Sequence, residues 1–215
     1  MAYGSRYYYN RAFDFEERDE DAEEMSKGPF KVLHSNLEIA AAVDGKLPGF
    51  YSFGEKKVAN TAAYQFITDG RFSTLKLSTP KIPQSFLTAI VSYFRQDLTK
   101  EAIVKVTYNK VLRRFFLRYP NMEETKAEKG YIIYNFSRWI QRDEITVLDI
   151  HSHNTMPAFF SATDDADEYI PGLYGVIGNL DSEQPTMAFR FSGWGIEKSL
   201  DMSELFAEEV SSDAV

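Results

Sequence analysis

The stretch that decides the fold reads LDIHSHNTMPAFFSATD, from Leu148 to Asp164. It starts as an apolar run and leads directly into two of the chain's three histidines, His151 and His153. On an extended strand, residues two apart point to the same face, so both imidazoles can reach one ion. Ser161 and Asp164 follow at the start of a predicted helix. The stretch therefore predicts a strand that supplies two nitrogen ligands and a helix that supplies a carboxylate.

These side chains suit zinc. Zinc accepts imidazole nitrogen and carboxylate oxygen at about 2.0–2.2 Å, and three protein ligands leave the fourth position to water, which is typical of catalytic sites. A zinc ion lowers the pKa of bound water toward roughly 7 and polarises carbonyls, so amide hydrolysis needs no Cys or Ser nucleophile. The chain has no Cys, which excludes thiol catalysis. Asp165 is an alternative third ligand, because it opens the same helix.

Each part of this pattern also has a purely structural interpretation. Two histidines on a strand can be packed and hydrogen-bonded, and Ser161 with Asp164 at the third helical position resembles a helix capping box. By ordinary residue frequencies, however, Ser and Asp at two preset offsets from a His-x-His pair should occur only roughly a few times in a thousand. The combination favours a metal site. His34 has no partner motif and is interpreted as a surface or core histidine.

The string HSHNTMPAFFSATD resembles the JAMM (MPN-plus) motif of zinc metallopeptidases in every defined position, and the acidic continuation DDADE is similar to the prokaryotic JAB branch. The resemblance covers about Thr74 to Gly195. It implies a cytidine-deaminase-like JAB/MPN fold, in which helices sandwich a mixed sheet of the α/β class. It also implies a zinc ion, a serine near the oxyanion and a glutamate that activates water, with the ligands and the serine at His151, His153, Asp164 and Ser161.

In that family the glutamate lies just after the first helix, where this chain has Glu101. A carboxylate there takes a proton from water and passes it to the leaving amine, as general base and then general acid. The sequence departs from the family at Asn154, where the eukaryotic members have Pro, and at Leu148-Asp149-Ile150, which replaces Gly-Trp-Tyr. These departures concern the substrate groove rather than the metal. Glutamates in polar connections remain rivals for the role of base, namely Glu55, Glu123, Glu124, Glu128 and Glu144.

Hydrophobic periodicity predicts the elements around the motif. Apolar residues at helical spacing predict a helix from about Pro83 to Leu98. The pair Asp69-Gly70 predicts a two-residue hairpin turn between strands Tyr64–Thr68 and Arg71–Leu77. An acidic helix is expected at about Ser161–Tyr169. Residues rich in β-branched and aromatic side chains predict further strands at Ile103–Tyr119, Tyr131–Trp139, Glu144–Ile150, Leu173–Ile177 and Thr186–Phe191.

Three parts are expected along the chain: an N-terminal acidic strip with a β-rich extension at 1–73, a JAMM domain at 74–200 and an acidic C-terminal tail at 201–215. The N-terminal part offers little core, so its strands are expected to pack onto the JAMM domain. The run FDFEERDEDAEEMSK, from Phe13 to Lys27, is interpreted as a solvated helix face or mobile strip, with a docking surface for a basic partner as the alternative.

The net charge and the hydropathy of the chain argue against two classes of partner, nucleic acids and membranes. A net charge of -8 argues against nucleic acid, whose binding depends on Lys and Arg neutralising phosphates. No stretch reaches the roughly 18 apolar residues of a membrane span and the start does not resemble a signal, so we expect a cytoplasmic protein without membrane contact.

The expected reaction is hydrolysis of an amide or isopeptide bond in a protein or peptide substrate. The family analogy adds a ubiquitin-like substrate that works beside E1-like and E2-like proteins. Two alternatives stay open. One is a non-catalytic scaffold with the same fold, although scaffolds of the family typically lose the His pair or the Asp. The other is a RadC-type protein linked to DNA processing, which is expected to have Pro-Ser-Gly where this chain has Asn154-Thr155-Met156.

Overall fold

The structure is a computed structural model that describes residues 31–120, 126–128, 131–133, 140–168, 171–193 and 195–208. The chain divides into two compact units, one ending at Pro80 and the other beginning at Lys81. Each unit has its own sheet, and helices are few in the described part of the chain, so the fold is of the predicted mixed α/β class. None of the described helices is long and apolar enough to cross a membrane.

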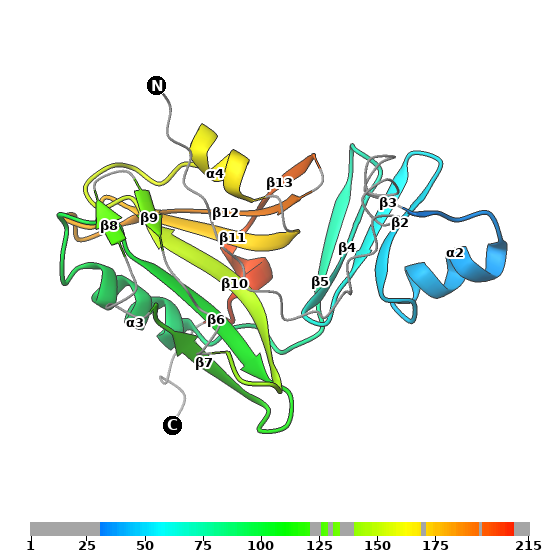
Figure 1. The fold of residues 1–215 in the computed structure, drawn as a ribbon, viewed down its shortest axis with the longest axis horizontal. Coiled ribbons are helices and arrows are strands. Elements are labelled where there is room, and N and C mark those ends of the chain that lie inside the picture. Colours follow the sequence, from blue (N-terminus) through cyan, green and yellow to red (C-terminus); the bar gives the residue numbers. More distant parts are fainter. Residues whose placement is uncertain are drawn as a thin grey trace. The chain divides into compact units, whose positions relative to one another are not determined.

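In its described residues, the unit that ends at Pro80 consists of a five-stranded sheet and one helix, arranged as in Figure 1. The strands follow one another in space as they do in sequence, and all pairs are antiparallel except β1–β2. Helix α2 (Asn36–Val43) lies between the first two strands in sequence. The strands are β1 (Lys31–Val32), β2 (Gly49–Phe53), β3 (Lys56–Asn60), β4 (Tyr64–Thr68) and β5 (Ser73–Leu77).

The predicted hairpin is present as β4–β5, but the prediction of a two-residue turn is wrong. Thr68 pairs with Ser73, so four residues make the connection. The Asp69 carboxylate accepts hydrogen bonds from the backbone N–H groups of Arg71 and Phe72 at 2.9 and 2.7 Å, which stabilises the longer turn. Gly70 supplies the positive φ of 89° that the turn requires.

Two side-chain amides hold α2 against the sheet of this unit. Asn60 donates to the carbonyls of Ala42 and Leu47 at 2.8 and 2.7 Å, and Gln65 donates to those of Ala42 and Val43 at 3.1 and 2.9 Å. The bonds to Ala42 and Val43 reach carbonyls in the last turn of α2, where intrahelical partners run out, and the bond to Leu47 holds the segment that follows. The position of α2 therefore depends on polar side chains as well as on apolar packing.

The unit that begins at Lys81 is built on a six-stranded mixed sheet, in the order β13-β12-β11-β10-β6-β7. Only β10 and β11 pair in parallel. Two short strands, β8 (Lys126–Glu128) and β9 (Tyr131–Ile133), form a separate antiparallel pair. Strand β9 coincides with the start of the predicted strand Tyr131–Trp139, whose remainder lies outside the described residues. The sheet strands are β6 (Ile103–Asn109), β7 (Arg114–Arg118), β10 (Glu144–Ser152), β11 (Gly172–Gly178), β12 (Thr186–Gly193) and β13 (Ile196–Leu200).

Helix α3 (Gln84–Phe94) packs its apolar residues, with Leu87, Ile90 and Phe94 buried. Phe86 of this helix makes an edge-to-face contact with Phe115 of β7, at a centroid distance of 5.9 Å. The predicted helix is confirmed, but it ends four residues before Leu98. Arg95 is its C-cap, and the Arg95 side chain donates to the carbonyls of Leu180 and Ser182.

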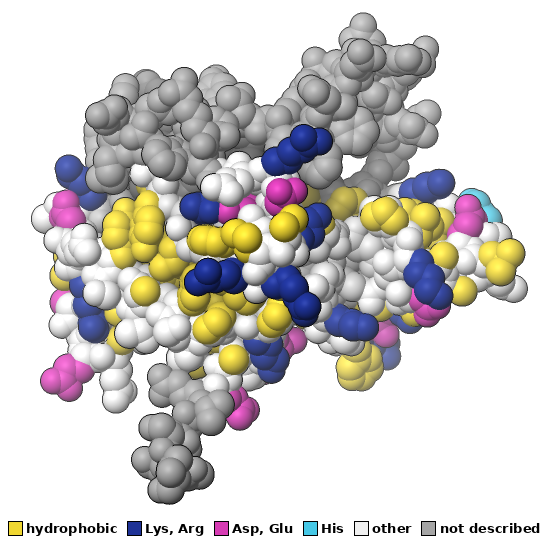
Figure 2. Space-filling model, turned by 90° about the horizontal axis from the view of Figure 1, so that it is seen from below, with side chains coloured by type: hydrophobic (Ala, Val, Ile, Leu, Met, Phe, Trp, Pro, Cys, Tyr) yellow, Lys and Arg dark blue, Asp and Glu magenta, His cyan; other side chains and the backbone are white. Residues whose placement is uncertain are grey.

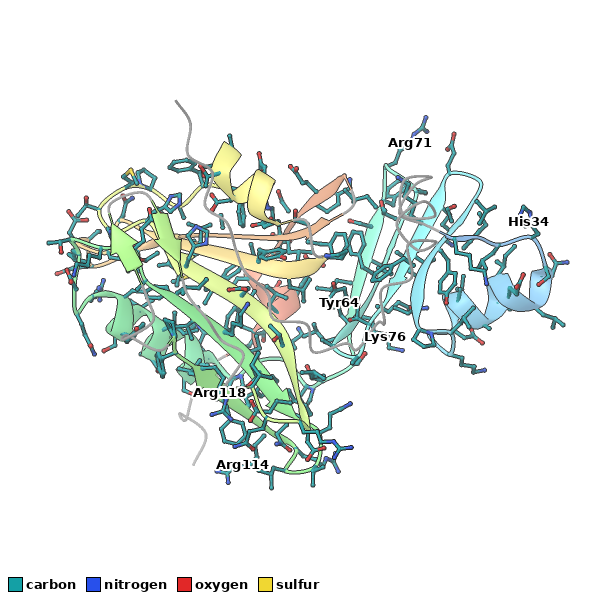
Figure 3. The ribbon with its side chains drawn as sticks, viewed as in Figure 1. His34, Tyr64, Arg71, Lys76, Arg114 and Arg118 are labelled. Atoms are coloured by element: carbon teal, nitrogen blue, oxygen red, sulfur yellow. The ribbon has the colours of Figure 1, made fainter. Side chains whose placement is uncertain are left out.

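The segment Ile103–Tyr119, predicted as one strand, is a hairpin of two. The side-chain oxygen of Asn109 accepts hydrogen bonds from the backbone N–H groups of Val111 and Leu112 at 3.0 and 2.8 Å. Arg113 completes the reversal with a φ of 53°. A polar side chain that binds its own backbone thus turns a segment whose composition favours a continuous strand. Figure 3 shows Arg114 and Arg118 on β7, which follows this turn.

The last elements of the chain were not predicted. Helix α5 (Met202–Leu205) follows β13, and Leu205 and Phe206 are buried. Ile82 donates its N–H to the carbonyl of Leu205 and accepts from the N–H of Ala207, both at 2.9 Å. The residues just after α5 are thus tied to the segment that leads into α3.

The predicted acidic strip Phe13–Lys27 lies outside the described residues. Its eight acidic and two basic residues give -6 of the chain's net charge of -8. The acidic character of the chain thus comes mainly from this one segment of sequence.

On the face shown in Figure 2, Lys and Arg side chains lie among hydrophobic ones.

Candidate metal centre

Strand β10 delivers the two histidines at the end of a buried run. Val147, Leu148 and Ile150 are at most 1% exposed, and the strand continues through His151 to Ser152. His151 pairs with Ile103 of β6 on one side and with Val176 of β11 on the other. The N–H of His153 donates to the carbonyl of Ile177 at 2.8 Å. Neighbouring strands therefore fix the backbone of both ligands.

The loop after His153 lies directly on the end of β11. The N–H groups of Asn179 and Leu180 donate to the carbonyls of Met156 and Asn154 at 2.6 and 2.7 Å. A Cβ atom on Gly178 would lie 2.1 Å from the carbonyl oxygen of Met156, so only glycine fits there. Asn154 has a φ of 50°, a value that proline cannot adopt. The departure from the eukaryotic motif at this position therefore reflects a different backbone conformation.

Helix α4 (Ala162–Asp167) presents Asp164, as the predicted acidic helix requires. Ser161 is its N-cap and forms a reciprocal capping box with Asp164. The Ser161 N–H and hydroxyl both donate to Asp164 Oδ2, at 2.6 and 2.7 Å, and the Asp164 N–H donates to the Ser161 hydroxyl at 3.3 Å. One carboxylate oxygen is thereby held by Ser161, which leaves Oδ1 to face His151.

The three predicted ligand residues converge. The Nε2 atoms of His151 and His153 lie 3.3 Å apart. Asp164 Oδ1 lies 3.2 Å from His151 Nε2, and Oδ2, the oxygen bound by Ser161, lies 4.0 Å from His153 Nε2. Ligand atoms about 2.0–2.1 Å from a tetrahedral ion stand roughly 3.3–3.4 Å from one another, so the spacing fits one zinc ion. These residues form the group of the described chain that could hold a metal.

The protonation of the histidines also fits a metal. Burial lowers the pKa of both imidazoles, although the Asp164 carboxylate opposes this in each case. Neutral imidazole has the free lone pair that a metal requires, whereas imidazolium does not.

Phe159 covers one side of His153 with an edge-to-face contact at 4.6 Å and is itself 46% exposed. The centre is therefore enclosed on one side and accessible at its rim.

Glu101 lies next to this group, two residues before β6. The neighbouring Ala102 exchanges two 2.8 Å hydrogen bonds with Ser152, the residue between the two histidines. The β6–β10 register pairs Ile103 with His151, so Glu101 lies two residues beyond this pair on the strand next to the histidines. Burial raises the pKa of Glu101 to about 7, and the Asp164 carboxylate adds to this rise. Such a carboxyl is suited to proton transfer near neutral pH.

The other predicted candidates are not part of this group where the structure describes them. Asp165 pairs with Arg190 at 2.8 Å and is outside the converging group. Glu55 is exposed in the β2–β3 turn, while Glu123, Glu124 and the side chain of Glu128 lie outside the described residues. His34 is exposed just before α2 (Figure 3).

Glu144 sits at the opposite end of β10 from His151, roughly 23 Å away along an extended strand. Burial would raise its pKa, but hydrogen bonds from Arg118 and Thr107 outweigh burial and lower it. Glu144 therefore forms a salt bridge with Arg118 and is not available as a base.

Sequence reasoning missed Arg190 of β12. This arginine pairs with Asp165 and Glu168, which follow Asp164 on α4 and at its C-cap, and is 5% exposed. No motif marks it. The available signal was a single cation inside the apolar strand Thr186–Phe191, because an arginine is seldom buried without carboxylate partners.

Comparison with known proteins gives the family. The family described as prokaryotic homologs of the JAB domain matches residues 84–192, which span α3 to β12. No curated protein matches the chain. Among solved structures, the solution structure of protein DSY2949 from Desulfitobacterium hafniense is 14% identical, with a TM-score of 0.39 over 60% of this chain and 94% of that one. The family match covers half of this chain and includes Glu101, both histidines and Asp164, so the chain belongs to the prokaryotic homologs of the JAB domain.

Proposed function

We propose that this chain is a zinc-dependent peptidase that hydrolyses an amide bond in a protein or peptide. The observation that carries the proposal is the convergence of His151, His153 and Asp164 beside Glu101, whose pKa burial raises to about 7. A purely structural cluster would not need a second, partly charged carboxyl held next to the first. Such a pairing is typical of sites that transfer protons.

In this proposal the two Nε2 atoms and the free Oδ1 of Asp164 hold the ion. When bound, zinc supplies Lewis acidity, which polarises a carbonyl and lowers the pKa of water. The neutral state of the buried imidazoles and the carboxylate charge of Asp164 favour a divalent cation.

Glu101 acts as the general base. Its carboxylate accepts a proton from the attacking water and then donates it to the leaving amine, so that the peptide nitrogen departs neutral. A pKa of about 7 leaves a substantial fraction ionised at neutral pH and makes the protonated form a competent acid. Accepting the proton from water and donating it to the leaving amine therefore both depend on Glu101.

The role proposed for Ser161 is to stabilise the oxyanion, as the family resemblance suggests. Its hydroxyl currently donates to Asp164 Oδ2, so it would have to turn its proton toward the substrate oxygen. Its backbone N–H also donates to that oxygen, at 2.6 Å, and would keep the carboxylate oriented during the turn.

The proposed substrate is the C-terminal tail of a ubiquitin-like protein, acting beside E1-like and E2-like proteins, and this part rests on family analogy. An extended tail would lie past the rim of the centre, where Met156 and Phe159 are 40% and 46% exposed. The alternative is a scaffold that keeps the fold without catalysis. The complete ligand set favours the enzyme.

Zinc content tests the metal half of the proposal. Purified protein is loaded with zinc, desalted and analysed for metal, with His151→Ala and Asp164→Ala as the test variants. His34→Ala is the matched control, because His34 is exposed and belongs to the other unit. Wild type and control should retain one equivalent and the test variants should lose it. Retention of a full equivalent by His151→Ala would refute the assignment.

Activity is then measured on fusion substrates that end in a diglycine tail, with zinc and with a chelator. The proposed enzyme cleaves in zinc, stops in chelator, and recovers when zinc is returned. A protein that binds zinc but cleaves none of the fusions at any concentration would support the scaffold instead.

A further inference from the structure

Arg190 lies on the face of the sheet that carries the metal centre. It pairs across the strands with Tyr174, and Tyr174 pairs with Asp149, two residues before His151. Residues paired or two apart share one face of a sheet, so Arg190 and His151 face the same side. Helix α4 lies over this side near β12 (Figure 1), and the ion pairs of Arg190 with residues of the α4 segment agree.

The contacts of Arg190 bracket Asp164. Its Nε and one terminal nitrogen lie 2.7 and 2.6 Å from Glu168 Oε2, and the other terminal nitrogen lies 2.8 Å from Asp165 Oδ1. The guanidinium also lies 3.9 Å from the ring centre of Phe160, just before the helix. One cation therefore holds the segment ahead of Asp164, the residue after it and the C-cap.

Helix α4 needs such support. It has six residues, and helices this short are marginal without tertiary contacts. Three acidic side chains, Asp164, Asp165 and Glu168, are crowded on this segment and repel one another unless a cation lies among them. Burying a guanidinium is itself costly, and the cost is offset only when carboxylates surround it. The costly burial of the Arg190 guanidinium therefore occurs next to Asp164, the candidate ligand residue on this helix.

We propose that Arg190 is a positioning residue for the metal centre, which holds α4 so that Asp164 Oδ1 stays within 3.2 Å of His151 Nε2. The inference rests on the proposed metal function, because it concerns the ligand geometry. Arg190 touches neither a ligand atom nor the reacting groups in the described contacts. It acts through Phe160, Asp165 and Glu168.

Arg190→Lys is the direct test, since lysine keeps the charge but loses the planar fork and the stacking surface. The zinc Kd, measured by competition with a chromophoric chelator, should rise about 10-fold, at the low end of what outer-shell changes cost. The thermal shift that zinc produces over the metal-free protein should shrink with it. This shift separates weaker binding from a general loss of stability.

Arg118→Lys is the matched control. Arg118 binds Glu144 through two nitrogens on the same sheet, but it is tied to β10 rather than to α4 (Figure 3). Its replacement should lower the melting temperature of the metal-free protein and leave the zinc Kd within twofold of wild type. If Arg190→Lys also stays within twofold while wild type binds zinc, Arg190 does not position the ligand. If wild type binds no zinc, the proposed function fails instead.

A second pair of variants covers the case in which Arg190→Lys does not fold. Glu168→Gln removes the carboxylate that binds two nitrogens of the Arg190 guanidinium. Glu197→Gln, on β13, removes a negative charge that lies 3.6 Å from the same guanidinium. Both lose one charge near the centre, but only the first loosens α4. Glu168→Gln should bind zinc at least fivefold more weakly than Glu197→Gln. Equal Kd values would overturn the inference.

Discussion

Replacing Glu101 with Gln should have opposite effects on turnover and on stability. The amide keeps the shape of the side chain but cannot accept a proton, so turnover on a cleaved substrate should fall on the order of 10²- to 10⁴-fold. Zinc should stay bound, because Glu101 is not among the three converging ligand residues. A residue that only supports the fold would not give this large loss of turnover.

The magnitude of the gain in stability follows from the burial of the carboxyl. Burial, with a contribution from Asp164, raises the pKa of Glu101 from 4.5 to about 7. One pKa unit is worth about 1.4 kcal/mol, so a fully enclosed group would lose about 3 kcal/mol on ionising in the folded state. Glu101 is only partly buried, and screening by solvent reduces this to about 1–2 kcal/mol. Removing the charge should return that amount to the metal-free protein.

The sign of the pH dependence is fixed by the direction of the shift. Below the unfolded pKa of 4.5 the carboxyl is protonated in both states, so wild type and Glu101→Gln should be equally stable. Between pH 4.5 and about 7 the unfolded chain ionises this group while the folded protein keeps the proton, so wild type loses stability until the folded carboxyl is also ionised above about 7, whereas the amide does not change. The variant should therefore be the more stable protein at about pH 8, and the difference should vanish toward acid.

Urea unfolding of metal-free protein at several pH values measures this difference. Glu183→Gln is the control, since Glu183 is exposed in the connection between β11 and β12 and its replacement should change neither stability nor turnover. Turnover of Glu101→Gln within a few-fold of wild type would show that another residue is the base. Equal stability of variant and wild type at all pH values would show that the carboxyl is not desolvated.

Two further substitutions test how the scaffold is held. Gly178→Ala places a Cβ 2.1 Å from a backbone carbonyl of the loop after His153, so the loop must shift, and zinc affinity should fall at least 10-fold by competition titration. Asn60→Ala removes hydrogen bonds to one carbonyl at the end of α2 and one in the segment after it, and should destabilise the unit ending at Pro80 by roughly 2–4 kcal/mol in urea unfolding. An Asn60→Ser variant that matched wild type would show that these bonds contribute little.

Where apolar periodicity and burial coincide, the sequence predicted the fold well. Helix α3 and strands β4, β10, β11 and β12 follow from apolar spacing, since the buried residues are the ones that set the pattern. Helix α2 escaped because its sequence NLEIAAAV is rich in Ala and carries little amphipathic contrast. Its start was marked only by the capping box of Ser35 and Glu38.

The errors have a common physical cause in polar side chains that bind the backbone. Asp69 lengthens a turn, and Asn109 splits one predicted strand into two. Each acts through a hydrogen bond whose partner is set by geometry and not by spacing of apolar residues. The same limit applies to Arg190, whose partners on α4 are 22 and 25 residues away in sequence.

At the candidate centre, the same hydrogen bonds between Ser161 and Asp164 support both the structural and the functional interpretation of the motif. Ser161 and Asp164 form a capping box, which taken alone could explain both residues as a helix start. Yet that box uses only Oδ2 of Asp164 and orients the carboxylate so that Oδ1 lies 3.2 Å from His151 Nε2. A cap at this spacing therefore orients a ligand as it begins a helix. Fixing the carboxylate before the metal binds reduces the ordering that binding would otherwise require.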